Sequence, residues 1–585
     1  MTPQITVLDT GGQYCHLIAR RVRELGIYAD VQQSDVPAAT LADRRGIIIS
    51  GGPASVYAPD SPTTEKELYA LGVPVLGICY GLQLMADSLG GEVALGDKGE
   101  YGKATLHVDD ASGLLAGFDA DEPVWMSHRD QVRTPPPGFR RTATTATCPV
   151  SAIEDGERKL YGVQFHPEVV HTLRGRRLLE NFLFGICGCV KDWDPQQQLP
   201  EIERQVQAIA AGRNVLFFAS GGVDSTVASA LCVRALGAER VHAVYVDTGL
   251  MREGETEFVE KTFEGFGHGV FEVVDARAEF LGQLAGVTEP ERKRHIIGEE
   301  FVRVQERILE RGRFLDGEWI LGQGTIYPDT IESGGTKKAD LIKTHHNRVA
   351  GIQRLMEANR IVEPLRDLYK DEVRVLGRTM QLPDELLDRH PFPGPGLAIR
   401  CLCSDAAAAV EATPEGWVVP VRSVGVQGDS RTYRPVLAVE ELPTEEVIDR
   451  ATHLINQRSD VNRVIARCGG HSPFSEAQVR PSAITEERLD RLRRADAIVR
   501  EMSEQSGFEQ QVWQFPVVLI PLGDAARPDS VVLRPIYSVD GMTASAVAMP
   551  DGLREALVAR LLEIPGVAHV LYDITHKPPA TIEWE

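Results

Sequence analysis

A cysteine between two glycines is the first feature of the sequence that can do chemistry. Gly77-Ile-Cys79-Tyr-Gly81 follows an apolar run and precedes a helical one. A strand, a tight turn and a helix around a nucleophile form an elbow, in which the glycines let the chain turn sharply and leave room for a substrate. A thiol at a helix N-terminus has its pKa lowered, because the helix dipole favours the thiolate. The alternative is a buried cysteine that packs as a small apolar side chain.

A histidine and a glutamate two residues apart supply the partners that such a thiol needs. The apolar run 160–165 leads into His166-Pro167-Glu168. Residues i and i+2 of an extended segment project to the same side, and Pro167 biases His166 towards β geometry. Glu168 can therefore orient an imidazole that accepts the thiol proton. A surface turn is the alternative for this motif alone, but the two motifs together predict acyl transfer from an amide.

The tetrahedral intermediate of acyl transfer needs hydrogen-bond donors for its oxyanion. The backbone N–H groups of Gly52 and Tyr80 are the candidates. Without the cysteine, Gly51-Gly52-Pro53 would be an ordinary turn.

A serine- and glycine-rich turn provides a second site. Between an apolar run at 215–218 and a helical one, the turn consists of Ser220, Gly221, Gly222, Val223, Asp224 and Ser225. Its small residues expose consecutive backbone N–H groups at a helix N-terminus, which predicts a phosphate cradle. Asp224 can cap the helix or approach a metal ion. A plain turn with a good helix cap is the alternative, and the spacing is not that of a Walker A loop.

Phosphates need cations, which an acidic chain must supply locally. The candidates in the same block are Arg292, Lys293, Arg294, Lys337, Lys338, Lys343, Lys370 and Arg374. Most lysines and arginines are solvated surface groups, so only their crowding into one block favours a phosphate site. Asp247-Thr-Gly249, at the end of the next apolar run, lies where open α/β sheets place ligands.

The elements that must position these residues fall into three blocks. In the first, residues 1–190, strand-like runs at 5–8, 46–50 and 73–78 alternate with helical runs. The second, residues 199–400, repeats this alternation after a polar linker and closes at the Pro/Gly-rich segment 390–396. Such alternation predicts two doubly wound α/β domains with mainly parallel sheets.

The third block, residues 401–585, contains one pattern twice. A strand, a helix and a strand occur with strands at 434–439 and 462–466, and again at 534–539 and 569–572. Self-similarity of this kind predicts a duplicated α+β unit, 401–480 and 481–585, with chance alignment as the alternative.

Length and composition restrict the class of protein. At 585 residues the chain is long enough for three to four domains. It carries 62 Lys and Arg against 84 Asp and Glu, a net charge of −22, which argues against nucleic acid as a partner. No apolar run approaches the ~18 residues of a membrane span, and the N-terminus lacks the pattern of a secretory signal. Nine cysteines, an odd number, fit a reducing cytoplasm.

The first block resembles the class I glutamine amidotransferases through Gly-Ile-Cys-Tyr-Gly-Leu-Gln at 77–83 and Gln-Phe-His-Pro-Glu at 164–168. The resemblance implies that Cys79, His166 and Glu168 hydrolyse glutamine to glutamate and ammonia, and that Gln83 helps to bind glutamine.

Two further strings carry resemblances. Met126-Ser-His128 with Asp130 resembles a loop near the glutamine pocket of that family, with a surface turn as the alternative. Ser-Gly-Gly-Val-Asp-Ser at 220–225 resembles the pyrophosphate loop of ATP pyrophosphatases, which cleave ATP between the α and β phosphates and adenylate a substrate. A glutaminase and an adenylating domain on one chain imply one reaction, in which ammonia displaces AMP and is delivered along a water-poor path.

The whole chain resembles the glutamine-hydrolysing GMP synthetase family. The strings that carry this resemblance are 331–333, 342–347, 390–396, 420–429 and 577–585. They imply that the substrates are glutamine, xanthosine 5′-monophosphate (XMP) and ATP with Mg²⁺, with no prosthetic group and no resident metal. The positions that match XMP contacts are Arg294, Asp429, Gln514, Lys577 and Glu583.

The chain departs from the common short form of that family by an additional unit at about 404–480. The resemblance to the longer form implies an internal pseudo-dimer, which allows a monomer; a homodimer is the alternative. Another glutamine-fed adenylating synthetase, such as one for NAD, is the second enzyme hypothesis, but the Cys-Glu-Lys glutaminase typical of that family is not found. A binding protein with inactive sites is disfavoured by the intact Cys79, His166, Glu168 and 220–225 motifs.

Overall fold

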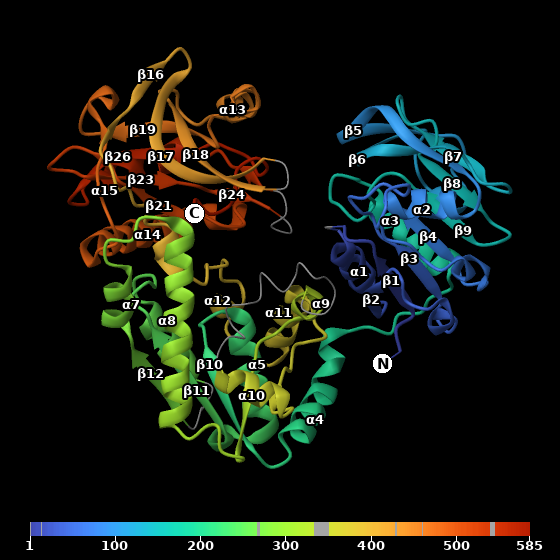
Figure 1. Ribbon diagram of the computed structural model, residues 1–585, viewed down its shortest axis with the longest axis horizontal. Coiled ribbons are helices and arrows are strands. Elements are labelled where there is room, and N and C mark those ends of the chain that lie inside the picture. Colours follow the sequence, from blue (N-terminus) through green and yellow to red (C-terminus); the bar gives the residue numbers. More distant parts are fainter. Residues whose placement is uncertain are drawn as a thin grey trace. The chain divides into compact units, whose positions relative to one another are not determined.

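The computed structural model describes residues 2–12, 14–265, 270–332, 350–427, 430–458, 460–538 and 544–585 (Figure 1). They form two compact units, which are described one at a time. The first is Met1–Gln198 with the short helix α9 (Tyr327–Glu332), and the second holds the rest of the chain from Leu199. No helix in the described ranges is long and apolar enough to cross a membrane.

The first unit is built on a nine-stranded sheet with the order β2-β1-β3-β4-β9-β8-β7-β5-β6. The five neighbouring strands β2, β1, β3, β4 and β9 are parallel to one another. Their bounds are β1 (Ile5–Asp9), β2 (Ala29–Gln33), β3 (Gly46–Ile49), β4 (Val75–Ile78) and β9 (Leu160–Val163). β3, β4 and β9 are buried along their whole length, as is typical of parallel strands covered on both faces.

The other half of this sheet is antiparallel. Its strands are β5 (Glu92–Val108), β6 (Asp121–Thr134), β7 (Arg140–Thr144) and β8 (Ala152–Asp155). The first residues of β6 alternate between exposed and buried, the pattern of a strand with one solvated face. The prediction of a mainly parallel sheet therefore holds for one half of this sheet and is wrong for the other.

Helices α1 (Cys15–Glu24) and α2 (Tyr80–Ser88) follow β1 and β4, and α3 (Gly175–Glu180) leads into a π-helical turn (Asn181–Ile186). The α2 side chains Leu82 and Met85 pack in one buried cluster with Ile47 and Val75. The predicted polar linker is only partly solvated, because Trp193 is buried and stacks on Tyr28 at 4.7 Å.

The second unit begins with a parallel five-stranded sheet in the order β12-β11-β10-β13-β14. The strands are β10 (Asn214–Ala219), β11 (Val241–Asp247), β12 (Val270–Asp275), β13 (Trp319–Gly322) and β14 (Ile361–Val362). The helices are α4 (Leu199–Ala210), α5 (Val223–Leu236), α6 (Glu255–Gly265), α7 (Arg277–Leu284), α8 (Pro290–Arg311), α10 (Ala350–Glu357), α11 (Lys370–Thr379) and α12 (Asp384–Leu387). The strand order reverses between β10 and β13, and open α/β sheets bind ligands outside the carboxyl ends of strands at such a point.

The C-terminal part holds a seven-stranded sheet in the order β16-β17-β18-β19-β26-β23-β21. Its strands are β16 (Glu411–Thr413), β17 (Gly416–Gln427), β18 (Ser430–Val439), β19 (Arg463–Gly470), β21 (Val517–Ile520), β23 (Asp529–Leu533) and β26 (Val567–Asp573). Short pairs add β15 (Ala408–Ala409), β20 (Gln478–Val479), β22 (Leu522–Gly523), β24 (Ile536–Tyr537) and β25 (Ser545–Ala546). The helices are α13 (Glu445–Gln457), α14 (Glu486–Ser506) and α15 (Asp551–Leu562).

Two strand–helix–strand segments meet in this sheet. β18–α13–β19 and β23–α15–β26 each form a parallel strand pair, and the segments join through the antiparallel pair β19–β26. The first strand of the second segment is Asp529–Leu533 rather than the predicted 534–539. This strand ends before Pro535, whereas the corresponding Pro435 lies within β18, at a shift in its register with β17. Residues 401–480 and 481–585 thus contribute to one sheet.

Candidate functional site

Cys79 occupies a strained turn between β4 and α2. Its φ of +52° and ψ of −105° are unusual for a residue with a side chain. The glycines on both sides are needed for close approach: a Cβ on Gly77 would lie 2.5 Å from the Gly81 carbonyl oxygen, and one on Gly81 would lie 2.3 Å from the Ile49 carbonyl oxygen. The sequence thus folds into the predicted elbow, with the thiol at the N-terminus of α2.

His166 and Glu168 lie together directly after β9. The Nδ1 atom of His166 is 2.7 Å from Oε1 of Glu168, and both side chains are buried. Burial lowers the pKa of His166, but the nearby Glu168 and Cys79 outweigh burial and raise this pKa to about 10. The site therefore favours a protonated imidazole next to the sulfur of Cys79.

The turn after β3 closes the other side of the pair. A Cβ added to Gly51 would lie 3.0 Å from Cε1 of His166 and 3.5 Å from Cβ of Cys79. Gly52 follows in the same turn, packed against Thr10, and Tyr80 supplies the first N–H of α2. Both oxyanion candidates therefore belong to segments that border the thiol.

A wall of polar groups completes this site. The Cys79 Sγ is 3.8 Å from the carbonyl oxygen of Ser127 on β6. The Gln83 side-chain nitrogen donates to the Asp130 carbonyl at 2.7 Å and to the Gln164 side chain at 3.2 Å, and Gln164 donates to the Cys79 sulfur at 3.5 Å. The sequence motifs include Gln164 and Ser127 but assigned neither a role, although Gln164 stands two residues before His166 and therefore on the same side of an extended chain.

The 126–130 segment is not a surface turn. It lies within β6, where the side chains of His128 and Asp130 are buried. Asp130 accepts hydrogen bonds from the hydroxyls of Ser55 and Tyr57. That alternative interpretation is therefore wrong.

The predicted phosphate loop lies between β10 and α5, at the switch point of the second sheet. Gly221 has a φ of +72°, and a Cβ there would lie 2.6 Å from a methyl carbon of Val259. The Ser220 hydroxyl lies 2.9 Å from the Ser225 hydroxyl and accepts from the Gly222 N–H at 3.2 Å. The loop is thus held in a defined shape at the helix N-terminus, where anions bind.

Asp224 faces a cation beside this loop. Its Oδ2 is 3.2 Å from the Nζ of Lys370, one of the predicted cations. Its Oδ1 is buried and has no hydrogen-bond partner among the described residues. Gly324, after β13, also borders the loop, because a Cβ there would lie 2.7 Å from the Ser225 nitrogen. Sequence reasoning missed Gly324, whose need for close approach depends on the fold.

The other predicted cations differ in their surroundings, and three of them lie outside the described residues. Lys293 is fully buried and pairs with the Glu585 carboxylate, so it is not the solvated phosphate ligand that was expected. Arg374 donates to the carbonyl of Leu387 at 2.9 Å, and the backbone N–H of Arg292 binds the side chain of Glu289. Lys337, Lys338 and Lys343 lie outside the described residues.

Three of the residues expected to contact XMP, all in the second unit, make side-chain hydrogen bonds to other residues of the chain. The guanidinium of Arg294 donates to the backbone oxygen of Glu585, and the Glu583 carboxylate binds Arg400 at 2.7 and 2.9 Å. The Gln514 side chain donates to the carbonyl of Pro391 at 2.7 Å. This hydrogen bond links the residues that precede β21 to the Pro/Gly-rich segment 390–396. Lys577 is half-buried, with its N–H bonded to the Ala544 carbonyl, and Asp429 lies outside the described residues.

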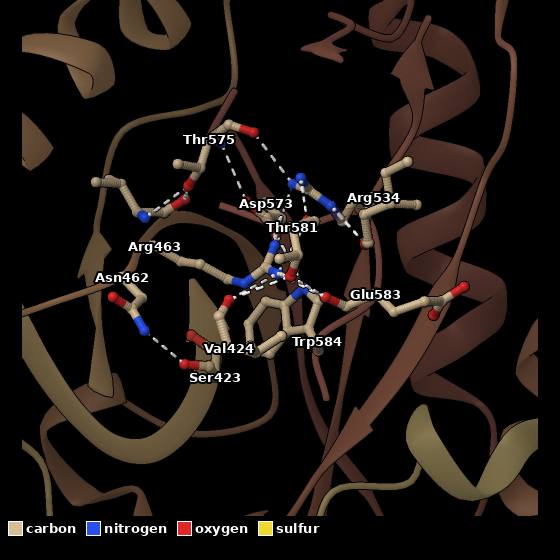
Figure 2. A network of polar contacts seen from close by, with 12 residues as sticks. Ser423, Val424, Asn462, Arg463, Arg534, Asp573, Thr575, Thr581, Glu583 and Trp584 are labelled. Atoms are coloured by element: carbon tan, nitrogen blue, oxygen red, sulfur yellow. Dashed lines mark hydrogen bonds and ion pairs between the residues drawn. The ribbon is translucent and has the colours of Figure 1, made fainter. Parts of the chain in front are cut away.

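Two buried arginines, one from each strand–helix–strand region, fasten the chain end (Figure 2). Arg463 and Arg534 both bind Oδ2 of Asp573, at 2.7 and 2.6 Å. Arg463 also donates to the backbone oxygens of Thr581 and Glu583, and Arg534 to that of Thr581. The tail that carries Glu583 therefore depends on both regions.

A buried cysteine–histidine–glutamate group and a serine- and glycine-rich loop at a sheet switch point are what the class of glutamine-dependent, ATP-using synthetases would require, and the comparisons show that class. Residues 6–186 match the family model for class-I glutamine amidotransferase, residues 196–273 that for NAD synthase, and residues 501–584 that for the GMP synthase C-terminal domain. The chain belongs to the glutamine-hydrolysing GMP synthase family.

Membership is shown by full-length relatives. A probable GMP synthase [glutamine-hydrolyzing] of Leptospira interrogans is 41% identical over 100% of this chain and 99% of its own length. The GMP synthases of Geobacillus kaustophilus and Symbiobacterium thermophilum are 40% and 42% identical, each over 99% of both chains.

Proposed function

We propose that the chain makes GMP with two sites, one that frees ammonia from glutamine and one that activates XMP with ATP. As a glutamine-hydrolysing GMP synthase it is a ligase that forms a carbon–nitrogen bond, uses glutamine as the nitrogen donor and converts ATP to AMP and diphosphate.

The first step is acyl transfer from glutamine to Cys79. The thiolate attacks the carboxamide carbon, and His166, oriented by Glu168, gives a proton to the leaving ammonia. The N–H groups of Gly52 and Tyr80 stabilise the oxyanion. Water, deprotonated by His166, then hydrolyses the thioester to glutamate.

Gln83 has a less direct part in this step than the resemblance implies. Its amide nitrogen already donates two hydrogen bonds, to the Asp130 carbonyl and the Gln164 side chain. The Gln83 side chain therefore holds these two residues in place. We assign to Gln83 the positioning of β6 and of Gln164 around the bound glutamine.

The second step is adenylation of XMP at the 220–225 loop. The loop N–H and hydroxyl groups hold the diphosphate end of ATP, and Lys370 offsets its charge. ATP is used with Mg²⁺, and the unpartnered Oδ1 of Asp224 is the oxygen in the loop that fits this ion. An oxygen of XMP attacks the α-phosphorus, diphosphate leaves, and ammonia then displaces AMP to give GMP.

XMP is assigned to the side chains near the chain end. Lys577 and Arg294 supply positive charge for the phosphate, and Gln514, Glu583 and Asp429 supply groups that can bind the hydroxyl and N–H donors of ribose and base. Support comes from the buried arginine network, which fixes the tail beside Glu583.

The observation that carries the proposal is the buried His166–Glu168 pair beside the strained Cys79. Cys79→Ala should abolish GMP formation with glutamine and leave formation with ammonium salts within about twofold. Cys187→Ala, in the same unit, is the matched control and should keep both activities. Loss of both activities in Cys79→Ala, with the fold intact by circular dichroism, would refute two separate sites.

We also propose that the protein works in the cytoplasm as a monomer. The two strand–helix–strand segments meet across β19 and β26 within one chain, as two subunits would across a dimer interface. Light scattering on the purified protein decides: the mass of one chain is expected, and twice that mass would favour the homodimer.

A further inference from the structure

Three potential metal ligands converge at one point behind the glutaminase site. Glu100 on β5 and His128 on β6 are register partners, and Cys148 lies in the turn between β7 and β8. One ligand atom from each residue lies within 4.8 Å of the others. Cys148 is completely buried and His128 nearly so, so the group is not a solvated surface cluster.

The histidine is held in the form that binds metals. Its Nδ1 is 2.9 Å from the carbonyl oxygen of Asp130, and because a carbonyl can only accept, Nδ1 carries a proton. A backbone carbonyl on the outer ring nitrogen is the usual support for a metal-binding histidine. Nε2 then faces Oε2 of Glu100 at 3.0 Å.

The glutamate is held in the same way. Its Oε1 accepts the hydroxyls of Thr145 and Thr147, both at 2.6 Å, which leaves Oε2 for the space shared with the histidine. Oε2 of Glu100 and Nε2 of His128, 3.0 Å apart, both carry lone pairs that one shared cation can accept.

We propose that Glu100 Oε2, His128 Nε2 and Cys148 Sγ bind one divalent transition-metal ion of borderline softness, with Zn²⁺ as the best fit. Zinc takes sulfur, imidazole and carboxylate ligands at about 2.0–2.3 Å in tetrahedral geometry, and three protein ligands leave a fourth position for water. On binding, the Cys148 thiol releases its proton to solvent and the sulfur–metal bond forms. The contact of Sγ with the Val150 carbonyl at 3.4 Å is given up.

Such an ion would fasten β5, β6 and the β7–β8 turn together. β6 also carries the Ser127 carbonyl that contacts Cys79, and the Asp130 carbonyl is shared by His128 and Gln83. The metal thus has a structural place in the wall of the glutaminase site, apart from the reacting atoms. The sequence alone predicted no metal here, because the three residues are brought together only by strand register.

Cobalt(II) titration of chelator-treated full-length protein tests the site. The expected result is one equivalent of Co²⁺ per chain with thiolate-to-cobalt charge-transfer absorption, which added Zn²⁺ removes. Cys148→Ser should abolish this absorption, and His128→Gln and Glu100→Gln should weaken binding about 10- to 100-fold or more. Cys79→Ser and Cys232→Ser are the matched controls and should bind as the wild type does.

Two results would overturn the proposal: a wild-type protein without the absorption at stoichiometric cobalt, or an unchanged absorption in Cys148→Ser. The first would mean that His128 and Glu100 only contact each other and hold no ion. If Cys148→Ser fails to fold, Glu100→Gln, which preserves size, gives the decision, since unchanged cobalt affinity in that variant contradicts the assigned ligand set.

Discussion

Glu168→Gln isolates the role of the orienting acid in the glutaminase site. The glutamine side chain has nearly the same size as glutamate, so the cavity stays filled, but the negative charge 2.7 Å from His166 Nδ1 is lost. Burial, which lowers the pKa of His166, would then be opposed by one carboxylate less, so this pKa should fall and the imidazole should lose the group that orients it.

The magnitude follows from the pKa of His166, which the pocket raises from 6.5 to about 10. At 1.36 kcal/mol per pKa unit, this corresponds to about 5 kcal/mol in favour of the protonated imidazole. Among the effects that raise this pKa the charge of Glu168 is the largest, followed by that of Cys79. We therefore expect the glutaminase kcat to fall by about 10³- to 10⁴-fold, which equals about 4–5.5 kcal/mol of barrier.

The assay compares glutamate release with ammonium-dependent GMP formation in the same preparation. Glutamate release should collapse while the KM for glutamine changes little and the ammonium reaction stays within about twofold. Glu180→Gln, which changes a half-exposed glutamate of α3, is the control and should behave as the wild type does. A loss of glutaminase activity smaller than about tenfold would refute the assigned role of Glu168.

Further outcomes follow from the second unit. Asp224→Asn should stop diphosphate release from ATP with either nitrogen source, and normal release would contradict the role of the loop. Asp573→Asn leaves Arg463 and Arg534 buried without their carboxylate, and should lower the free energy of unfolding by about 3–5 kcal/mol in urea titrations; a change below about 1 kcal/mol would contradict this reading. Burial first, and then the charge of Arg467, lowers the pKa of His569 to about 4, so the unfolded chain binds more protons between pH 6.5 and 4 and stability should fall as the pH drops through this window. In His569→Gln, unfolding midpoints measured across this window should show a smaller acid dependence, and an unchanged dependence would exclude His569 as the cause.

Local patterns were enough to predict the arrangement of residues that are close to one another in the sequence. Cys79 needs only an elbow between a strand and a helix, and His166 and Glu168 need only an extended segment, so both arrangements follow from neighbours in the chain. The Ser220–Ser225 loop is similar, since β10 and α5 flank it directly.

Residues that meet through topology could not be predicted in this way. Arg463, Arg534 and Asp573 join only because β19 and β26 are neighbours in the sheet. Lys293 looked like a solvated cation, and its burial is explained by a carboxylate at the far end of the chain, that of Glu585. The antiparallel half of the first sheet was missed because the motif there, 126–130, was interpreted as a loop and the strand-like runs that were recognised, 5–8, 46–50 and 73–78, lie in the parallel half.

The most direct test of the account follows the nitrogen atom. The wild-type protein is incubated with XMP, ATP, Mg²⁺ and glutamine labelled with ¹⁵N in its amide, and the products are analysed by mass spectrometry. We expect labelled GMP, with one AMP, one diphosphate and one glutamate for each GMP formed. Consumption of glutamine and ATP without labelled GMP would contradict this expectation.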